Sequence, residues 1–256
     1  AVALTAPAGV SAAWNNPYPA ADADRNILYS AFRERPKTFD PARAYSSNEY
    51  LLIAQIYEPP FQYHYLKRPY TLIPLTAVSV PTPVYLDKQG QRLSRNAPAT
   101  AIAHSVYEIR IRPGIYYQPH PAFARADDGR FLYHALDAHD LVGAYAIGDF
   151  PKTGTRELVA ADYVYQIKRL AHPKLHSPIL SVMNEYIVGI RDYAKTLKQA
   201  YDEIADGRDK GVYLDLTRYP LAGVEEVDRY TYRVKINGKY PQLLYWMAMP
   251  FFAPLP

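Results

Sequence analysis

Histidine pairs are the first candidates for chemistry in this chain, because imidazoles bind metal ions and transfer protons. His172 and His176 have the i, i+4 spacing that could bring two imidazoles to one metal ion. Pro173 interrupts any helix that would align them, and no glutamate lies between them to act as a general base. Two solvent-facing loop histidines are therefore the better interpretation.

A second group of potential ligands lies in the stretch HALDAHD, where His134, His139 and Asp140 could bind a cation. A polar loop is the favoured interpretation of these residues. A metal-dependent enzyme is kept as a third hypothesis that depends on them. We predict no metal site and no cofactor.

Other reaction chemistries lack the residues they need. GDFPKTGT, residues 148–155, has glycines at the spacing of a phosphate-binding loop, but not the Gly-Lys-Ser/Thr ending that meets phosphate and magnesium. No Gly-x-Ser-x-Gly elbow presents a serine nucleophile, and a chain without cysteine has no thiol nucleophile or disulfide. Glu225 and Glu226 are adjacent and would point apart on a strand. We therefore predict a binding protein with no catalytic residue, and not an enzyme.

The composition is that of an ordinary folded protein with an excess of tyrosine. Of 256 residues, 49% are hydrophobic and 21% are charged, which excludes a disordered or fibrous chain and allows one large domain or two smaller ones. The 25 tyrosines outnumber 8 phenylalanines and 2 tryptophans, and tyrosine suits sites that contact polar and apolar groups together. The net charge of +4 is scattered along the chain, so nucleic acid is not an expected partner.

Hydrophobic periodicity predicts helices over residues 47–57, 159–170 and 183–206. The apolar residues of the first are too crowded for one stripe, which indicates burial on more than one side. The second has an apolar stripe that faces a core, formed by Val159, Tyr163, Ile167 and Leu170. Its polar side is expected to face solvent and is formed by Asp162, Gln166 and Arg169.

Alternating residues predict strands over 106–112 and 228–236, and a short strand over 26–32. The second of these ends at Asn237-Gly238, which is a hairpin signal. The segments 66–104 and 118–156 are rich in Pro, Gly and polar residues and are expected to form long loops with little strand content. The first 25 residues are Ala- and Pro-rich and are expected to form an extended arm.

Several segments match the motifs of one protein family in order. TFDPARAYSSNEYLLIAQIYEPPFQY is similar to an opening signature in which a Leu-Asp-Pro turn precedes a helix that ends in Tyr-Glu-Gly-Leu. YEIRIRPGIYYQP, VAADYVYQIKRLAHPKLHSPIL, IVGI and GVEEVDRYTYRVKI are similar to its later strand, helix, Ile-x-Gly-Ile and Asp-x-x-Thr motifs. Over residues 27–256 the chain thus resembles the extracellular solute-binding proteins of ABC importers, in the oligopeptide, dipeptide and nickel-binding family (family 5).

Some residues depart from the family pattern. Pro59-Pro60 replaces Gly-Leu after Tyr57-Glu58, so the chain is expected to leave the first helix in a different direction. Val159 stands where the family has a threonine that could cap the helix, which leaves Asp162 alone to satisfy a free N–H group. The loops 66–104 and 118–156 are longer than in the family pattern.

The resemblance implies an α/β (α+β mixed) fold: a periplasmic-binding-protein-like type II lobe with a mixed β-sheet and packed helices. The chain would be the N-terminal portion of a larger two-lobed protein, with the second lobe beyond residue 256. The implied domains are an extended arm in 1–25, the first segment of lobe I in 26–58, and an inserted smaller α/β domain in 59–256.

The resemblance also implies a function. The protein would be the substrate-binding component of an ABC importer that captures oligopeptides or related solutes between two lobes in the periplasm. Its partners would be a peptide or small-molecule solute, the importer permease and the C-terminal remainder of the same protein. The implied ligand-binding residues are Tyr45, Ser46, Ser47, Ile179 and Leu180. For Ile179 and Leu180, packing in the core is the alternative.

A second hypothesis is a non-transport interaction or sensor subunit on the same scaffold, which associates with a separate remainder. The apolar run over residues 243–255 supports it, because an apolar surface of that length should be covered.

Overall fold

The computed structural model describes residues 19–22, 24–27, 29, 31, 34–137, 139–205 and 212–255. The chain divides into two compact units, Ala1–Arg35 and Pro36–Pro256. Within the first unit, Ala20–Asp22 forms one 3-10 turn, and Arg25 forms an ion pair with Asp22 at 2.9 Å. Much of the strand expected over 26–32, and of the arm expected over 1–25, lies outside the described residues; the described positions 26, 27, 29 and 31 are not in a strand.

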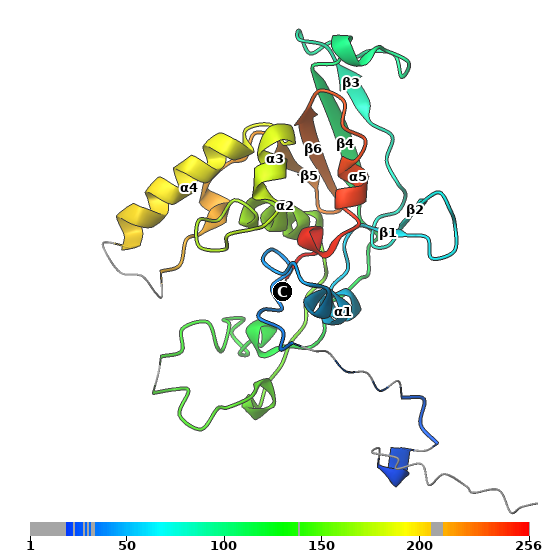
Figure 1. The fold of residues 1–256 in the computed structure, drawn as a ribbon. Coiled ribbons are helices and arrows are strands. Elements are labelled where there is room, and N and C mark those ends of the chain that lie inside the picture. The colour runs from blue at the N-terminus through cyan, green and yellow to red at the C-terminus, as the bar shows by residue number, and fades with distance from the viewer. Residues whose placement is uncertain are drawn as a thin grey trace, which may run out of the picture. The chain divides into compact units, whose positions relative to one another are not determined.

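The second unit contains helices, two β-sheets and long loops (Figure 1). This confirms the predicted mixture of helices and strands. The helices are α1 (Ser47–Ile56), α2 (Ala160–Arg169), α3 (Leu180–Tyr186), α4 (Ile190–Ala205) and α5 (Leu243–Trp246). The strands are β1 (Phe61–Tyr63), β2 (Leu72–Pro74), β3 (Val84–Leu86), β4 (His104–Arg110), β5 (Val224–Asp228) and β6 (Thr231–Asn237).

The larger sheet has the strand order β3-β4-β6-β5, and β1 pairs with β2 in a separate hairpin. All of these pairings are antiparallel, in contrast to the mixed sheet that was expected. The central pair, β4 and β6, joins Tyr107 to Val234 and Glu108 to Arg233. The predicted alternation of β4 is confirmed, because Tyr107 and Ile109 are buried while Glu108 and Arg110 are exposed.

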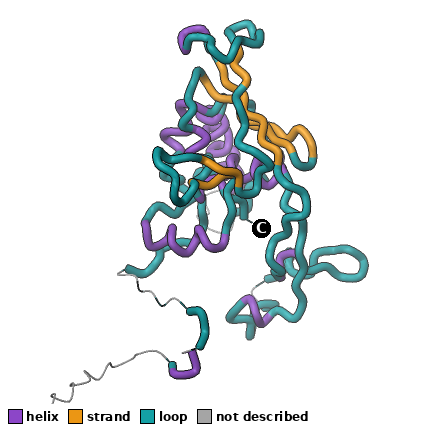
Figure 2. The backbone as a smooth tube through the Cα atoms, turned by 90° about the vertical axis from the view of Figure 1, so that its right-hand side faces the viewer, coloured by secondary structure: helices purple, strands orange, loops and turns teal. Residues whose placement is uncertain are grey.

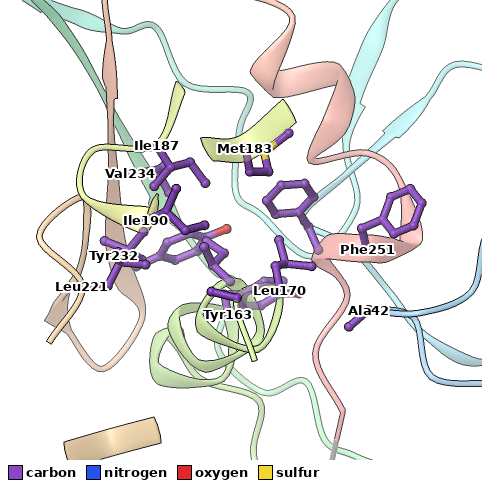
Figure 3. Close-up of a cluster of buried hydrophobic side chains, with 14 of the residues drawn as sticks. Ala42, Tyr163, Leu170, Met183, Ile187, Ile190, Leu221, Tyr232, Val234 and Phe251 are labelled. Atoms are coloured by element: carbon purple, nitrogen blue, oxygen red, sulfur yellow. The ribbon is translucent and has the colours of Figure 1, made fainter. Parts of the chain in front are cut away.

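Helix α2 packs against β5 and β6 of this sheet, so its apolar stripe faces the core as predicted. The rings of Tyr163 from α2 and Tyr232 from β6 stack with centroids 5.5 Å apart and an interplanar angle of 3° (Figure 3). The Tyr163 hydroxyl lies 2.5 Å from the Thr76 hydroxyl and donates to the Glu58 carbonyl oxygen at 3.1 Å. Both rings are at most 1% exposed, so this pair lies at the centre of the core.

The polar side of α2 does not face solvent, and that prediction was wrong. Asp162 is 9% exposed, forms a bidentate ion pair with Arg156 at 2.5 and 3.0 Å, and accepts a hydrogen bond from the Val159 N–H at 2.9 Å. The last contact confirms that Asp162 satisfies a free N–H at this helix start. Gln166 is 1% exposed, and its side-chain amide donates to the Phe251 carbonyl oxygen at 2.8 Å. Neighbouring segments can cover this polar side of α2 because they supply hydrogen-bond partners for its polar groups.

The helix predicted over 183–206 is two helices, α3 and α4. Between them Gly189 adopts φ +76°, a backbone conformation that only glycine adopts without strain. The connecting residues bring Val188 N–H to the Lys235 carbonyl oxygen at 3.1 Å, so the break is fixed by a contact with β6. Apolar periodicity continues across the break, which explains why the sequence predicts one helix.

Asn237-Gly238 does not lead into a hairpin. The Gly238 N–H donates to the Ala103 carbonyl oxygen at 2.7 Å, and the chain continues into α5 instead of a pairing strand. The hairpin of this region joins β5 to β6 through residues 229 and 230. The apolar run that follows is mostly buried within the same unit, with Leu243, Met247 and Ala253 at 0% exposure.

Helix α1 is less buried than predicted. Ile53 and Glu49 are its buried residues, whereas Leu51 is 59% and Ile56 is 54% exposed. The segment around residues 118–156 is irregular, as expected, and its described residues form short 3-10 turns and isolated β-bridges (Figure 2). Residues 66–104 likewise have little regular structure before β4 begins: β2, β3, one 3-10 turn and isolated β-bridges at Ala77 and Arg92.

Candidate ligand-binding site

The loop that precedes α1 is shaped by an aspartate turn. The Asp40 carboxylate accepts a hydrogen bond from the Ala42 N–H at 2.9 Å, and the Asp40 carbonyl oxygen accepts from Arg43 and Ala44. Such Asx turns reverse the chain locally. The second carboxylate oxygen of Asp40 lies 2.6 Å from Arg169 at the end of α2. The turn is thereby attached to the core of the unit.

A single buried carboxylate holds the rest of this loop. Glu49 is 4% exposed and accepts hydrogen bonds from the backbone N–H groups of Lys37, Tyr45 and Ser46 at 2.9, 3.1 and 3.2 Å. Burial alone would raise the pKa of Glu49, but these donors outweigh it and lower the pKa to about 2. The carboxylate therefore stays charged and fixes the backbone of Tyr45 and Ser46.

This loop forms one wall of a pocket of about 460 Å³. The volume is within the range of small-ligand sites. The other walls come from α1, β1 and the segment after β6. The pocket is lined by Ala44, Tyr45, Ser46, Ser47, Tyr50, Ile53, Tyr63, Trp246, Ala248, Met249, Pro250 and Phe251.

Aromatic contacts organise the pocket. Tyr45 faces Phe251 with ring centroids 6.3 Å apart, and Tyr63 lies 5.8 Å from Tyr245. The indole N–H of Trp246 donates to the Tyr240 hydroxyl at 3.0 Å, which fixes the tryptophan ring. Tyr45 is 75% exposed, so its ring is accessible from solvent at the pocket wall.

None of the residues that line this pocket carries a charged side chain. Burial, with the neighbouring Tyr245, Tyr50 and Tyr70, raises the pKa of the Tyr63 hydroxyl, which therefore stays protonated at neutral pH. Hydroxyl groups of serine and tyrosine are the polar side-chain groups of the pocket, whereas the indole N–H is already donated to Tyr240. The wall thus offers ring faces and neutral hydrogen-bonding groups.

The structure brings three of the five predicted ligand-binding residues together in this pocket: Tyr45, Ser46 and Ser47. Ile179 is 1% exposed in the core, and Leu180 begins α3; neither lines the pocket. A ligand contact for any of the five stays a prediction. The sequence reasoning missed Tyr50, Tyr63, Trp246 and Phe251. A usable signal was the aromatic content of the run YPQLLYWMAMPFF, which was interpreted only as a surface to be covered.

A larger hollow of about 530 Å³ lies on the solvent-facing side of the four-stranded sheet. Three of its four charged side chains contact one another, because Arg233 lies 2.8 Å from Glu108 and 3.2 Å from Glu225; Lys235 is the fourth. It contains none of the predicted ligand-binding residues. We therefore take the aromatic pocket as the candidate site.

The histidines proposed as metal ligands lie apart from this pocket. His134 stacks on Phe131 at 3.9 Å and contacts the Ala122 carbonyl oxygen at 2.8 Å, while Asp140 accepts from the Asp137 N–H at 3.0 Å. Burial and the nearby Arg169 lower the pKa of His172. Within the part of the chain that the structure describes, no three His, Cys, Asp or Glu side chains are grouped to hold a metal ion. In the same part, no helix has the length and apolar character needed to span a membrane.

Comparison with known proteins identifies the fold. No family model matches the chain, and no curated protein matches it significantly. Among solved structures, the murein tripeptide binding protein MppA of Escherichia coli is 14% identical, with 88% of this chain and 30% of that chain covered and a TM-score of 0.50. OppA of Listeria monocytogenes, bound to peptide, is 15% identical, with 85% and 28% covered and a TM-score of 0.45.

The chain therefore spans under a third of the length of these structures. This chain has the fold of part of the murein tripeptide binding protein.

Proposed function

We propose that this chain is part of the substrate-binding component of an ABC-type importer, which captures oligopeptides or related solutes for delivery to a membrane permease. The observation that carries the proposal is the uncharged aromatic pocket at Tyr45, Ser46 and Ser47, in a chain with a solute-binding fold. The proposed location is the periplasm, and no catalytic residue or cofactor takes part.

Capture is proposed to occur between two lobes. A ligand closes a two-lobed protein only if it gains contacts in the closed form that the open form lacks, so both lobes must contribute groups. The pocket would supply the contacts of one lobe. The C-terminal remainder of the protein would supply the second lobe, and the exposed Leu51 and Ile56 of α1 support further protein packing against this unit.

The structure removes the observation that motivated the alternative, a non-transport interaction or sensor subunit. The apolar run that motivated it packs inside the same unit, where Leu243 and Met247 are fully buried. That run therefore gives no reason to require a separate partner.

Calorimetry with a mixture of tri- to pentapeptides tests the proposal. We expect weak binding by the chain of 256 residues alone and at least about tenfold tighter binding by a protein that includes the second lobe, because only closure engages both sets of contacts. Full-strength binding by this chain alone would contradict the two-lobed mechanism. No peptide binding by either protein would exclude the function.

A further inference from the structure

The pocket at Tyr45 has no charged side chain among its lining residues. Its lining combines the rings of Tyr45, Tyr50, Tyr63, Trp246 and Phe251 with the aliphatic side chains of Ile53 and Met249. A buried ion without a partner is strongly unfavourable, whereas a neutral ring gains contact area on every wall. Charge complementarity therefore selects a neutral occupant.

Glu49, the one carboxylate in the stretch 44–53 that supplies half of the lining, is not available to a ligand. Both oxygens of Glu49 are occupied by backbone N–H groups of the loop, at 2.9 Å from Lys37 and 3.1 Å from Tyr45. Glu49 does not line the pocket. A cationic side chain in the pocket would therefore meet no counter-charge among the lining residues, and an anionic one would meet no cation there.

The hydroxyl groups define where polar atoms of a ligand can lie. Ser46 and Ser47 are exposed at the start of α1, and Tyr45 is 75% exposed next to them. These three residues line the pocket from one segment of the chain, and the Ser46 side chain also caps α1 at Glu49, while Trp246 and Phe251 line the pocket from the segment after β6. An occupant with a neutral polar backbone and an apolar side chain matches both walls.

We infer that this pocket takes an uncharged aromatic or branched aliphatic side chain of the captured solute, and that it rejects acidic and basic side chains. The inference rests on the proposed role in solute capture and adds the chemical class that this lobe selects. Charged groups of a solute are left for other parts of the protein to bind.

Trp246 provides a direct reporter, because the chain has only two tryptophans and the other, Trp14, can be replaced by phenylalanine. Trp246 emission in the Trp14→Phe protein is titrated with the N-acetyl amides of phenylalanine, leucine, aspartate and lysine. These probes carry charge only in their side chains. We expect phenylalanine and leucine amides to reach half-saturation at about tenfold lower concentration than the aspartate and lysine amides.

Two variants locate the effect. Tyr45→Ala should weaken phenylalanine amide binding about fivefold, while Tyr65→Ala, at an 87% exposed tyrosine outside the pocket, should leave it unchanged. Ser47→Asp adds a carboxylate in the first turn of α1, where the helix dipole tolerates it. It should shift preference toward the lysine amide by about threefold.

The outcomes separate this inference from the proposed function. Equal binding of all four amides, tighter binding of a charged amide, or no response of Trp246 to any amide would overturn the inference. If peptides bind in calorimetry without any side-chain preference, capture stands and the selectivity is wrong. If the phenylalanine amide saturates the pocket but no peptide binds, the selectivity stands and the transport role is wrong.

Discussion

Asp40 and Arg169 are 129 residues apart in the chain, and their side chains lie 2.6 Å apart. Both side chains are less than one-fifth exposed. Arg169 also donates to the Gln166 side chain at 2.9 Å, so one guanidinium joins the turn before α1 to the polar side of α2. The position of the loop that carries Tyr45 is thus fixed by contacts with the core as well as by its own helix, α1.

Breaking this pair should destabilise the protein. Asp40→Asn keeps the oxygen that accepts from Ala42 but removes the charge, and Arg169→Gln removes the cation. We expect each to lower the free energy of unfolding by about 2 kcal/mol and the double variant by about 1 kcal/mol less than their sum. Urea unfolding measures all three. Purely additive effects would show that the pair is not coupled.

An exposed ion pair serves as the control for this cycle. Lys198 and Asp202 on α4 lie 2.6 Å apart with both side chains more than half exposed. Asp202→Asn should change the free energy of unfolding by less than about 0.5 kcal/mol.

Glu49 should give the protein a distinct acid dependence. Its pKa of about 2 lies below its ordinary value, so its stabilising effect is complete above about pH 5 and is lost as the pH falls toward 2. Glu49→Gln cannot titrate and should be less stable at neutral pH, with the difference from the parent protein shrinking in that window. Urea unfolding from about pH 2 to about pH 6 measures this difference; a constant difference would argue against the carboxylate as the cause.

Two stacked tyrosines should respond oppositely to loss of a hydroxyl. Tyr163 bonds Thr76 and the Glu58 carbonyl, whereas the Tyr232 hydroxyl is buried with no hydrogen-bond partner among the described residues. Tyr163→Phe should lower the free energy of unfolding by about 1 to 2 kcal/mol, and Tyr232→Phe should leave it unchanged or raise it. Thermal unfolding followed by circular dichroism distinguishes them. Equal destabilisation would contradict the assignment of hydrogen-bond partners to the Tyr163 hydroxyl and not to the Tyr232 hydroxyl.

Gly223 should not tolerate a side chain. A Cβ there would lie 2.8 Å from the Val188 backbone nitrogen and 3.0 Å from the Lys235 carbonyl oxygen, and neither backbone atom can move aside. We expect Gly223→Ala to cost more than about 2 kcal/mol of unfolding free energy. Gly148→Ala is the matched control, because a Cβ at that residue would meet no neighbouring atom within 4 Å. Similar stability of both variants would contradict the close approach of these backbones.

Local patterns predicted the elements whose apolar residues lie along one face. The alternation around Tyr107 and the apolar stripe of Tyr163, Ile167 and Leu170 identified β4, α2 and the side on which they pack. These predictions succeeded because burial on one face leaves a period of two or of about 3.6 residues in the sequence.

Contacts between distant segments were not predictable in this way. Asp162 and Gln166 have the polarity of surface residues, but Arg156 and the Phe251 carbonyl satisfy them inside the protein. The same holds for the pocket: Tyr45 and Ser47 were identified from a resemblance, while Trp246 belongs to a segment far later in the chain. No local pattern records which distant chain covers a given side chain.

The hydrogen bond from Gln166 to Phe251 also bears on biosynthesis. Eighty-five residues separate the two partners, so α2 is complete on the ribosome long before the segment that seals it has been made. During that interval its amide and the cavity that Leu243, Met247 and Phe252 will occupy stay open to water and to other nascent chains. A chaperone that shields apolar surfaces would therefore matter most for this protein while translation proceeds between those two points.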